Sequence, residues 1–404
     1  MKIIEGGVTA AKGFSASGVH AGIRKSKKKR DLGLIYSEKR AAAAALYTTN
    51  LVKGAPLAVT KEHIKDGFAQ AIIVNSGNAN TCNANGIEIA EQTALLLSKE
   101  LKIAKEDVVV ASTGVIGQQM TIEPFAEGIP PLVGSLSNEG SSLAAEAMMT
   151  TDTVKKEVAV SFTVGGKEAK LGGIAKGSGM IHPNMATMLV FLTTDCAISP
   201  KMLQKALSND VQNSFNMVSV DGDTSTNDMV VILANGLAGN APIEEEGEDF
   251  TAFMTALNTV TVALCKALAA DGEGATKFLE CRVSGAKTLA DAKKAAKAVI
   301  CSSLVKAAMF GSDANWGRVL CAVGYSGADV DVTKIGVTFK SKKGEITVCE
   351  NGAGVDFSEE KAKEILLESE ITIDVTFADG DASATAWGSD LTYDYVKING
   401  DYRT

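Results

Sequence analysis

A turn-rich segment that runs directly into an apolar stretch is the feature that most restricts how this chain can fold. Residues 176–187 read Lys-Gly-Ser-Gly-Met-Ile-His-Pro-Asn-Met-Ala-Thr. The glycines permit backbone angles closed to other residues, and Pro183 has a fixed φ and no amide donor. The apolar residues 188–192 that follow are typical of a strand covered on both faces. The segment therefore predicts a central strand that is entered from an irregular loop at Thr187.

Two interpretations of Thr187 are open. In the first, its hydroxyl caps a nearby backbone group, which is the more frequent role of an arbitrary threonine. In the second, the hydroxyl attacks the Ala186 carbonyl, the amide becomes an ester, and water releases a new N-terminal threonine. Its free α-amine, with an ordinary pKa of about 7.7 to 8.0, then takes the proton from the same residue's hydroxyl. One residue would supply both nucleophile and base.

Two further predicted strands end in loops that suit a site at a sheet edge. Residues 69–74 lead into the turn-rich residues 75–80, and the Val-rich residues 107–112 lead into Thr113 and Gly114. Loops at strand ends are where α/β proteins build their sites. A glycine turn lets a backbone amide and a neighbouring hydroxyl converge on an oxyanion, where one donor contributes about 2.7 to 4 kcal/mol. An ordinary strand-to-loop turn is the alternative interpretation.

The rest of the chain alternates helices with short strands. A hairpin is predicted for residues 158–174, joined at Gly165-Gly166, and it leads to Lys176. From about residue 335 the pattern predicts a compact α+β lobe. Helical patterns cover residues 86–101, 141–149, 200–213, 250–270, 289–299 and 358–367.

The polar residues 221–228 suggest a calcium loop, but the pattern argues against one. An EF-hand needs Gly at its sixth position and Glu at its twelfth, where this chain has Thr226 and Ile232. A structural turn whose side chains satisfy backbone donors is expected instead. We expect no metal site elsewhere, because the seven cysteines are dispersed and never form Cys-x-x-Cys.

Composition excludes several classes of protein. With 404 residues, 46% hydrophobic and 22% charged, the chain predicts two or three globular domains. No span of about 20 apolar residues and no secretory signal stands out, so neither a membrane segment nor export is expected. The net charge of −8 argues against nucleic-acid binding. The basic residues 24–30 are better interpreted as a solvated loop than as a nucleic-acid patch. The cysteine pattern indicates reduced thiols in a cytoplasmic protein.

Seven motifs carry a resemblance to a known family, in the family's order and over nearly the whole chain. They are residues 111–117, 149–153, 176–189, 219–228, 271–276, 311–318 and 398–404. The chain resembles the ornithine acetyltransferases, also called the ArgJ family or bifunctional glutamate N-acetyltransferases.

The resemblance implies a fold and an assembly. The expected fold class is α/β (α+β), the layered α-β-β-α fold of ArgJ and DmpA-like self-processing enzymes with an N-terminal threonine nucleophile. Cleavage between Ala186 and Thr187 would give two chains that assemble as an α2β2 heterotetramer. The expected domains are residues 1–186, the first part of the catalytic domain, residues 187–280, which complete its core, and residues 281–404, a smaller lobe with a tail that returns to the active site.

The resemblance also implies roles for particular residues. Thr187 would be the nucleophile, and Thr113 and Gly114 the oxyanion hole. Substrate would be bound by Thr150, Lys176, Thr187, Glu273, Asn399 and Thr404. Thr151 is the alternative to Thr150. As a hypothesis, Lys176 faces a substrate carboxylate and Glu273 the ornithine amine.

The implied reaction is ping-pong acetyl transfer from N2-acetyl-L-ornithine to L-glutamate in cyclic arginine biosynthesis. It needs no cofactor, and acetyl-CoA is open as a second acetyl donor. The implied partners are these small amino acids, with no nucleic acid and no membrane. Two other functions stay open, a self-cleaving aminopeptidase or amidase that passes the acyl group to water, and a non-enzymatic binding protein on the same scaffold.

Overall fold

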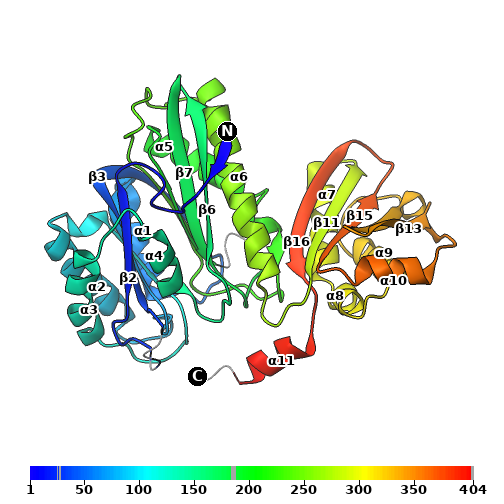
Figure 1. Cartoon of the computed structure of the whole chain (residues 1–404), viewed down its shortest axis with the longest axis horizontal. Coiled ribbons are helices and arrows are strands. Elements are labelled where there is room, and N and C mark those ends of the chain that lie inside the picture. Colours follow the sequence, from blue (N-terminus) through cyan, green and yellow to red (C-terminus); the bar gives the residue numbers. More distant parts are fainter. Residues whose placement is uncertain (25, 27–28, 183–187, 402–404) are drawn as a thin grey trace. The chain divides into compact units, whose positions relative to one another are not determined.

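The computed structural model describes residues 1–24, 26, 29–182 and 188–401 (Figure 1). Within these residues the chain forms two compact units. The first unit contains Met1–Gly177, residues 188–215 and Thr224–Leu264. The second unit contains Ser178–His182, Asn216–Asp223 and residues 265–401. The expected boundary at 186/187 lies outside the described residues. Residue 280, the other expected boundary, lies inside strand β11 (Phe278–Ala286), so the expected C-terminal lobe is part of a larger unit.

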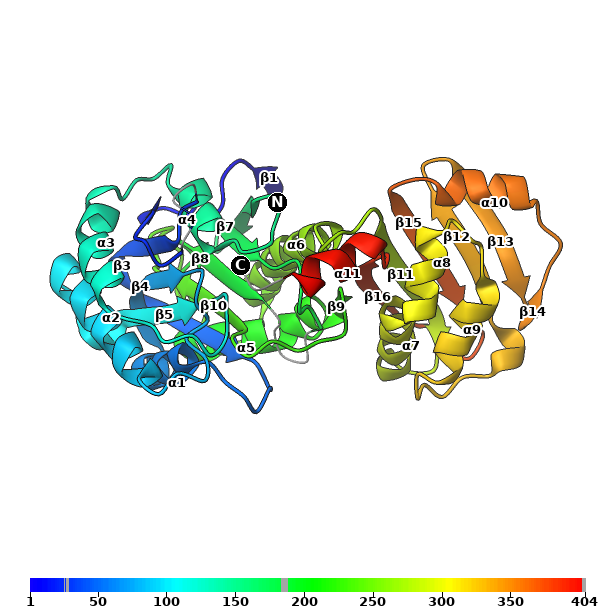
Figure 2. The same ribbon diagram turned by 90° about the horizontal axis from the view of Figure 1, so that it is seen from below.

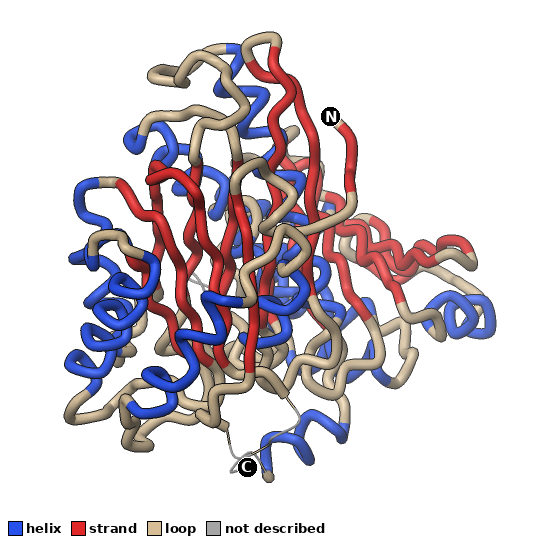
Figure 3. The backbone as a smooth tube through the Cα atoms, turned by 60° about the vertical axis from the view of Figure 1, so that its left-hand side comes forward, coloured by secondary structure: helices blue, strands red, loops and turns tan. Residues whose placement is uncertain are grey.

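A nine-stranded sheet organises the described part of the first unit (Figure 3). Its strand order is β1-β6-β7-β8-β10-β3-β4-β5, and β2 pairs with β3. The strands are β1 (Lys2–Ile4), β2 (Phe14–Val19), β3 (Leu32–Tyr47), β4 (Phe68–Asn75), β5 (Val108–Ser112), β6 (Lys156–Val164), β7 (Lys167–Lys176), β8 (Leu189–Thr194) and β10 (Met229–Ala234).

The centre of this sheet is the strand predicted to follow Thr187. All six residues of β8 are buried, and β8 pairs with β7 on one side and with the parallel β10 on the other. The predicted hairpin is confirmed as β6 and β7, since Gly165 and Gly166 at its turn have φ of 52° and 70°. Both angles lie in the left-handed region that a two-residue hairpin turn requires.

Helices cover both faces of the sheet, because its strands are apolar on both sides. In β4, Ala71 and Ile73 face one core with α2 and α3, whereas Ile72 and Val74 face the other with α4. The helices of this unit are α1 (Ala55–His63), α2 (Gly86–Leu101), α3 (Glu123–Gly134), α4 (Ser141–Met148), α5 (Pro200–Val211) and most of α6 (Glu248–Ala270). The predicted α/β class is confirmed.

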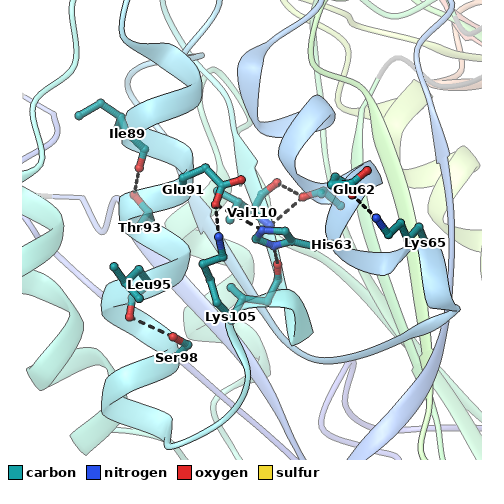
Figure 4. A network of polar contacts seen from close by, with 12 residues as sticks. Glu62, His63, Lys65, Ile89, Glu91, Thr93, Leu95, Ser98, Lys105 and Val110 are labelled. Carbon is teal, nitrogen blue, oxygen red and sulfur yellow. Dashed lines mark hydrogen bonds and ion pairs between the residues drawn. The ribbon is translucent and has the colours of Figure 1, made fainter.

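Helix α1 protects the edge strand β5, which pairs with another strand, β4, on one side only. The Thr60 hydroxyl donates to the Val110 carbonyl at 2.8 Å and accepts the Val110 amide at 2.9 Å. His63 Nδ1 lies 2.8 Å from the Val108 carbonyl oxygen. Figure 4 labels His63 and Val110 of this network and shows Lys105 paired to Glu91 beside them. Side chains thus replace the missing neighbouring strand.

Helix α6 corrects the expectation that no apolar span is long enough to cross a membrane. It has 23 residues and a mean hydropathy of 1.5 over its most apolar window, and half of that window is buried. Phe253, Leu257 and Val260 are fully buried on one side, and Thr255 is exposed. Phe253 meets Phe162 of β6 edge-on, with 6.3 Å between ring centroids. This packing is that of a core helix in a globular protein, which passes the same compositional test.

The second unit combines a sheet with helices, and it includes residues 335–401, for which the sequence predicts an α+β lobe (Figure 2). Its described residues form a seven-stranded sheet with the order β14-β13-β12-β15-β11-β16-β9. The strands besides β11 are β9 (Val218–Ser219), β12 (Gly336–Ser341), β13 (Gly344–Glu350), β14 (Ala353–Gly354), β15 (Glu370–Thr376) and β16 (Ala382–Ser389). The helices are α7 (Leu289–Cys301), α8 (Ser303–Phe310), α9 (Trp316–Gly324), α10 (Glu359–Leu366) and α11 (Tyr393–Gly400). The Thr288 side chain caps α7 by accepting a hydrogen bond from the Asp291 amide.

Candidate active site

The predicted oxyanion pair lies where β5 ends, against the loop that follows β4. The Thr113 amide donates to the Asn75 carbonyl at 2.9 Å. Gly114 has a φ of 129°, and a Cβ there would come within 2.4 Å of the Gly77 carbonyl carbon. Only glycine fits this close approach without strain. The two loops are therefore held together at the edge of the sheet.

A network of buried side-chain amides holds these two loops in place. The Ser112 hydroxyl donates to Asn75 Oδ1 at 2.6 Å, and Asn75 Nδ2 donates to the Asn78 carbonyl at 2.9 Å. Asn227 Nδ2 donates to the Ser112 carbonyl at 3.0 Å and also to the Ala79 carbonyl. Sequence reasoning assigned no individual role to Asn227, because only its place in a polar turn was visible. Because its Nδ2 donates to both loops, the Asn227 side chain connects them.

Lys176 lies beside Thr113. It is the last residue of β7 and is 8% exposed, and its Nζ lies 3.4 Å from Thr113 Oγ1. Strands β7 and β5 are separated by four others in the sheet order. The fold therefore brings together two predicted site residues that are 63 positions apart in the sequence.

Asp152 organises the polar surroundings of Lys176. Its Oδ1 accepts the Lys156 ammonium and the Gly177 amide, both at 2.7 Å, and its Oδ2 accepts the Thr150 amide at 3.0 Å. Burial raises the pKa of Asp152, but the charges of Lys176 and Lys156 and these hydrogen bonds outweigh burial and lower it to about 2. The carboxylate is therefore ionised at neutral pH. It fixes the backbone of the predicted substrate residue Thr150.

A second buried acid, Asp228, precedes β10. It is 2% exposed, and its Oδ2 has no hydrogen-bond partner among the described residues. Burial raises the pKa of Asp228 well above the ordinary value, against the opposing effects of a Ser225 hydrogen bond and the Lys176 charge. The next residue, Met229, donates its amide to the Met188 carbonyl at 2.9 Å. Asp228 therefore lies beside the start of the predicted nucleophile strand, where burial disfavours its charged form.

Two other predicted site residues meet in the second unit. Asn399 Nδ2, on α11, donates to Glu273 Oε2 at 2.7 Å. Glu273 is only 8% exposed, and its backbone amide donates to the Ser178 carbonyl at 2.8 Å. The C-terminal segment up to Asn399 is thus docked against the loop that carries Glu273.

Three predicted site residues, Ala186, Thr187 and Thr404, lie outside the described residues. Within the described ranges, no group of three or more His, Cys, Asp or Glu side chains is arranged to hold a metal ion.

His182 Nδ1 lies 3.1 Å from the Ser219 hydroxyl oxygen. Burial and the nearby Lys297 charge lower the pKa of His182 to about 4. Its imidazole is therefore neutral at pH 7.

Comparison with known proteins finds relatives over the full length of this chain. The model of the ArgJ family matches residues 15–404. The arginine biosynthesis bifunctional protein ArgJ of Caldanaerobacter subterraneus subsp. tengcongensis is 54% identical, over 100% of both chains. The bifunctional protein ArgJ 1 of Clostridium acetobutylicum is 50% identical, over 97% of this chain and 96% of the relative. A crystal structure of ornithine acetyltransferase complexed with ornithine, from Mycobacterium tuberculosis, is 35% identical over 46% of this chain and 99% of that chain, with a TM-score of 0.42.

Proposed function

This chain belongs to the ArgJ family, and on that premise we propose that it is an acetyltransferase of arginine biosynthesis that transfers an acetyl group from N2-acetyl-L-ornithine to L-glutamate. The observation that carries the proposal is 54% identity, over the whole of both chains, to a bifunctional arginine biosynthesis enzyme. The contact between Lys176 and Thr113 supports it, because it joins a cation to the loop of the proposed oxyanion hole.

The proposed reaction starts with self-cleavage. The Thr187 hydroxyl adds to the Ala186 carbonyl, the peptide C–N bond breaks to leave an ester and a free α-amine, and water then hydrolyses the ester. In the acetyl transfer, the hydroxyl oxygen bonds to the acetyl carbon while the free amine takes its proton. The amide bond of N2-acetyl-L-ornithine breaks, and ornithine leaves with a proton. The α-amine of glutamate then attacks the acetyl ester and restores the hydroxyl.

The remaining groups of the site stabilise charge in this scheme. The Gly114 amide and the Thr113 hydroxyl donate to the oxyanion, and the buried amide network holds both in place before substrate arrives. Lys176 binds a substrate carboxylate, and Glu273 binds the ornithine amine. Thr150, Asn399 and Thr404 complete the substrate contacts. An enzyme with the Lys176→Ala change and unaltered affinity for both substrates would contradict the assignment of Lys176.

The proposal extends to assembly and location. Residues 1–186 and 187–404 form the two chains of an α2β2 heterotetramer in the cytoplasm. The reaction needs no resident cofactor, because nucleophile, base and oxyanion donors all come from the chain. Acetyl-CoA serves as a second acetyl donor for glutamate, which makes the enzyme bifunctional like its named relatives.

The test compares the parent enzyme with Thr187→Ala and with Thr251→Ala, a control on the exposed side of α6. Mass spectrometry of the parent and the control should give two fragments, the second beginning Thr-Met-Leu, and both should convert N2-acetyl-L-ornithine and glutamate into ornithine and N-acetylglutamate. Thr187→Ala should stay uncut and inactive. Equal transfer by Thr187→Ala would refute the mechanism, and release of acetate without N-acetylglutamate would identify the amidase alternative.

A further inference from the structure

Five residues of the chain belong to the second unit although the chain on both sides belongs to the first. We call this segment, Ser178–His182, the strap. Gly177 is held in the first unit by the Asp152 carboxylate, and Met188 accepts the Met229 amide there. Between these points, the described strap residues make their backbone contacts with the second unit.

Asp221 fixes the strap through its carboxylate. Its Oδ2 accepts the Met180 amide at 2.6 Å, and its Oδ1 accepts the Ile181 amide at 2.9 Å. Beside it, the Val220 amide donates to the Ile181 carbonyl at 2.7 Å. Met180 has a φ of 56°, which is unfavourable for a methionine, so its conformation depends on these contacts. The polar turn thus has the structural role that its sequence predicts.

The strap lies directly against Glu273. The Ser178 carbonyl accepts the Glu273 amide at 2.8 Å. A Cβ on Gly179 would lie 2.3 Å from the carboxyl carbon of Glu273, so the carboxylate occupies the space that a side chain at position 179 would need. The backbone of Gly179 does not require φ in the left-handed region. Glycine is needed there for space alone.

Helix α11 also contacts the Glu273 carboxylate. Asn399 Nδ2 donates to Glu273 Oε2 at 2.7 Å. The Tyr395 hydroxyl, one turn earlier on α11, donates to Asp221 Oδ2 at 3.3 Å. Burial and the negative charge of Asp221 both raise the pKa of Tyr395, so the hydroxyl keeps its proton and remains a donor. One carboxylate, Asp221, therefore contacts both the strap and α11, the two elements that contact Glu273.

We propose that Gly179 and Asp221 are positioning residues that set the Glu273 carboxylate for recognition of the cationic donor substrate. This rests on the proposed function for the role of Glu273. The strap and α11 both contact Glu273, and Asp221 contacts both of them. After cleavage between Ala186 and Thr187, the strap belongs to the first chain, whereas Asp221, Glu273 and α11 belong to the second. The first chain then contributes part of the substrate specificity of a unit that is otherwise built from the second.

The first experiment changes the space beside Glu273. Gly179→Ala should displace the carboxylate and raise KM for N2-acetyl-L-ornithine by about tenfold or more, since a hydrogen bond to a charged group contributes on that scale. KM for glutamate should stay the same or fall, because a displaced carboxylate no longer repels an anionic acceptor. Gly324→Ala is the matched control, because the space around Gly324 is open. In a Glu273→Gln background, Gly179→Ala should add little.

The second experiment uses amide hydrogen exchange to test whether Asp221 holds the strap, and it does not depend on enzymatic activity. Asp221→Ala should speed exchange of the Met180, Ile181 and Glu273 amides at least about tenfold, because the strap loses its carboxylate partner. Asp223→Asn, an exposed acid in the same turn, should leave these rates unchanged. The full-length protein is used in both experiments.

The outcomes separate this inference from the proposed function. If the parent enzyme transfers no acetyl group, the proposed function fails, and the exchange rates still decide whether Asp221 holds the strap. Unchanged exchange at Met180 and Ile181 in Asp221→Ala overturns the positioning role of Asp221. Equal changes in KM for donor and acceptor in Gly179→Ala overturn the specificity role of Gly179.

Discussion

Replacement of the buried Asp152 by Asn should destabilise the first unit by an amount that follows from its ionisation. The pKa of Asp152 falls from an ordinary 3.8 to about 2. At about 1.36 kcal/mol per pKa unit, the ionised carboxylate adds roughly 2 to 3 kcal/mol to the folded state relative to its protonated form. Asn is close in shape to that protonated form. Asp152→Asn should therefore lower the free energy of unfolding at pH 7 by roughly 2 to 3 kcal/mol.

The pH dependence of this difference has a definite sign. A carboxyl with a lowered pKa stabilises the folded state fully above 3.8, and the contribution is lost as the pH falls through 3.8 towards 2. The difference in free energy of unfolding between the parent and Asp152→Asn should thus be constant from pH 7 to about 5 and shrink by about half near pH 3. Asp152→Ala should cost more, about 3 to 5 kcal/mol, since it leaves buried lysine charge without this partner.

The assay is urea unfolding followed by far-UV circular dichroism at pH 7 and pH 3. Tryptophan fluorescence gives a separate signal from the second unit, because Trp316 and Trp387 both lie there. Glu127→Gln is the control, an exposed acid on α3 of the first unit. If the free energy of unfolding of Asp152→Asn at pH 7 lies within about 0.5 kcal/mol of that of the control, the reasoning is refuted. Substitutions at ordinary surface positions change this free energy by that much.

Three further predictions follow from close contacts in the first unit. Gly114→Ala should lower kcat for acetyl transfer by about 10² to 10³, because the added methyl pushes one oxyanion donor away from the loop after β4; an unchanged kcat would remove Gly114 from the oxyanion hole. Asn227→Leu should lower the free energy of unfolding by about 1 to 3 kcal/mol, since two buried carbonyls lose their donor. An unfolding curve that matches the parent would contradict this role. Thr60→Val should speed hydrogen exchange at the Val110 amide, whose acceptor it removes, and equal rates in variant and parent would show that α1 does not protect the edge of the sheet.

Reasoning from sequence predicts best where a pattern is local and strong. The apolar run after Thr187 became the buried strand β8, and the Gly165-Gly166 turn became a hairpin. Tertiary packing decides elsewhere. The alanines 41–45 favour a helix by propensity, yet they lie in β3, between β4 and β10, where small side chains are buried on both faces. In α6, composition alone does not separate a core helix from a membrane span.

The polar turn from Asp221 to Asp228 shows why the supports of a site are harder to predict than its reactive groups. A reactive group is recognised by its own chemistry, but a supporting group is defined by the partners that folding brings to it. Asp221 belongs to the second unit and holds the strap beside Glu273, whereas Asn227 belongs to the first unit and joins the loops beside Thr113. One short stretch therefore supports two sets of predicted site residues, and their partners are 40 or more positions away in the sequence. A substitution at either position should alter substrate handling without removing a reactive group.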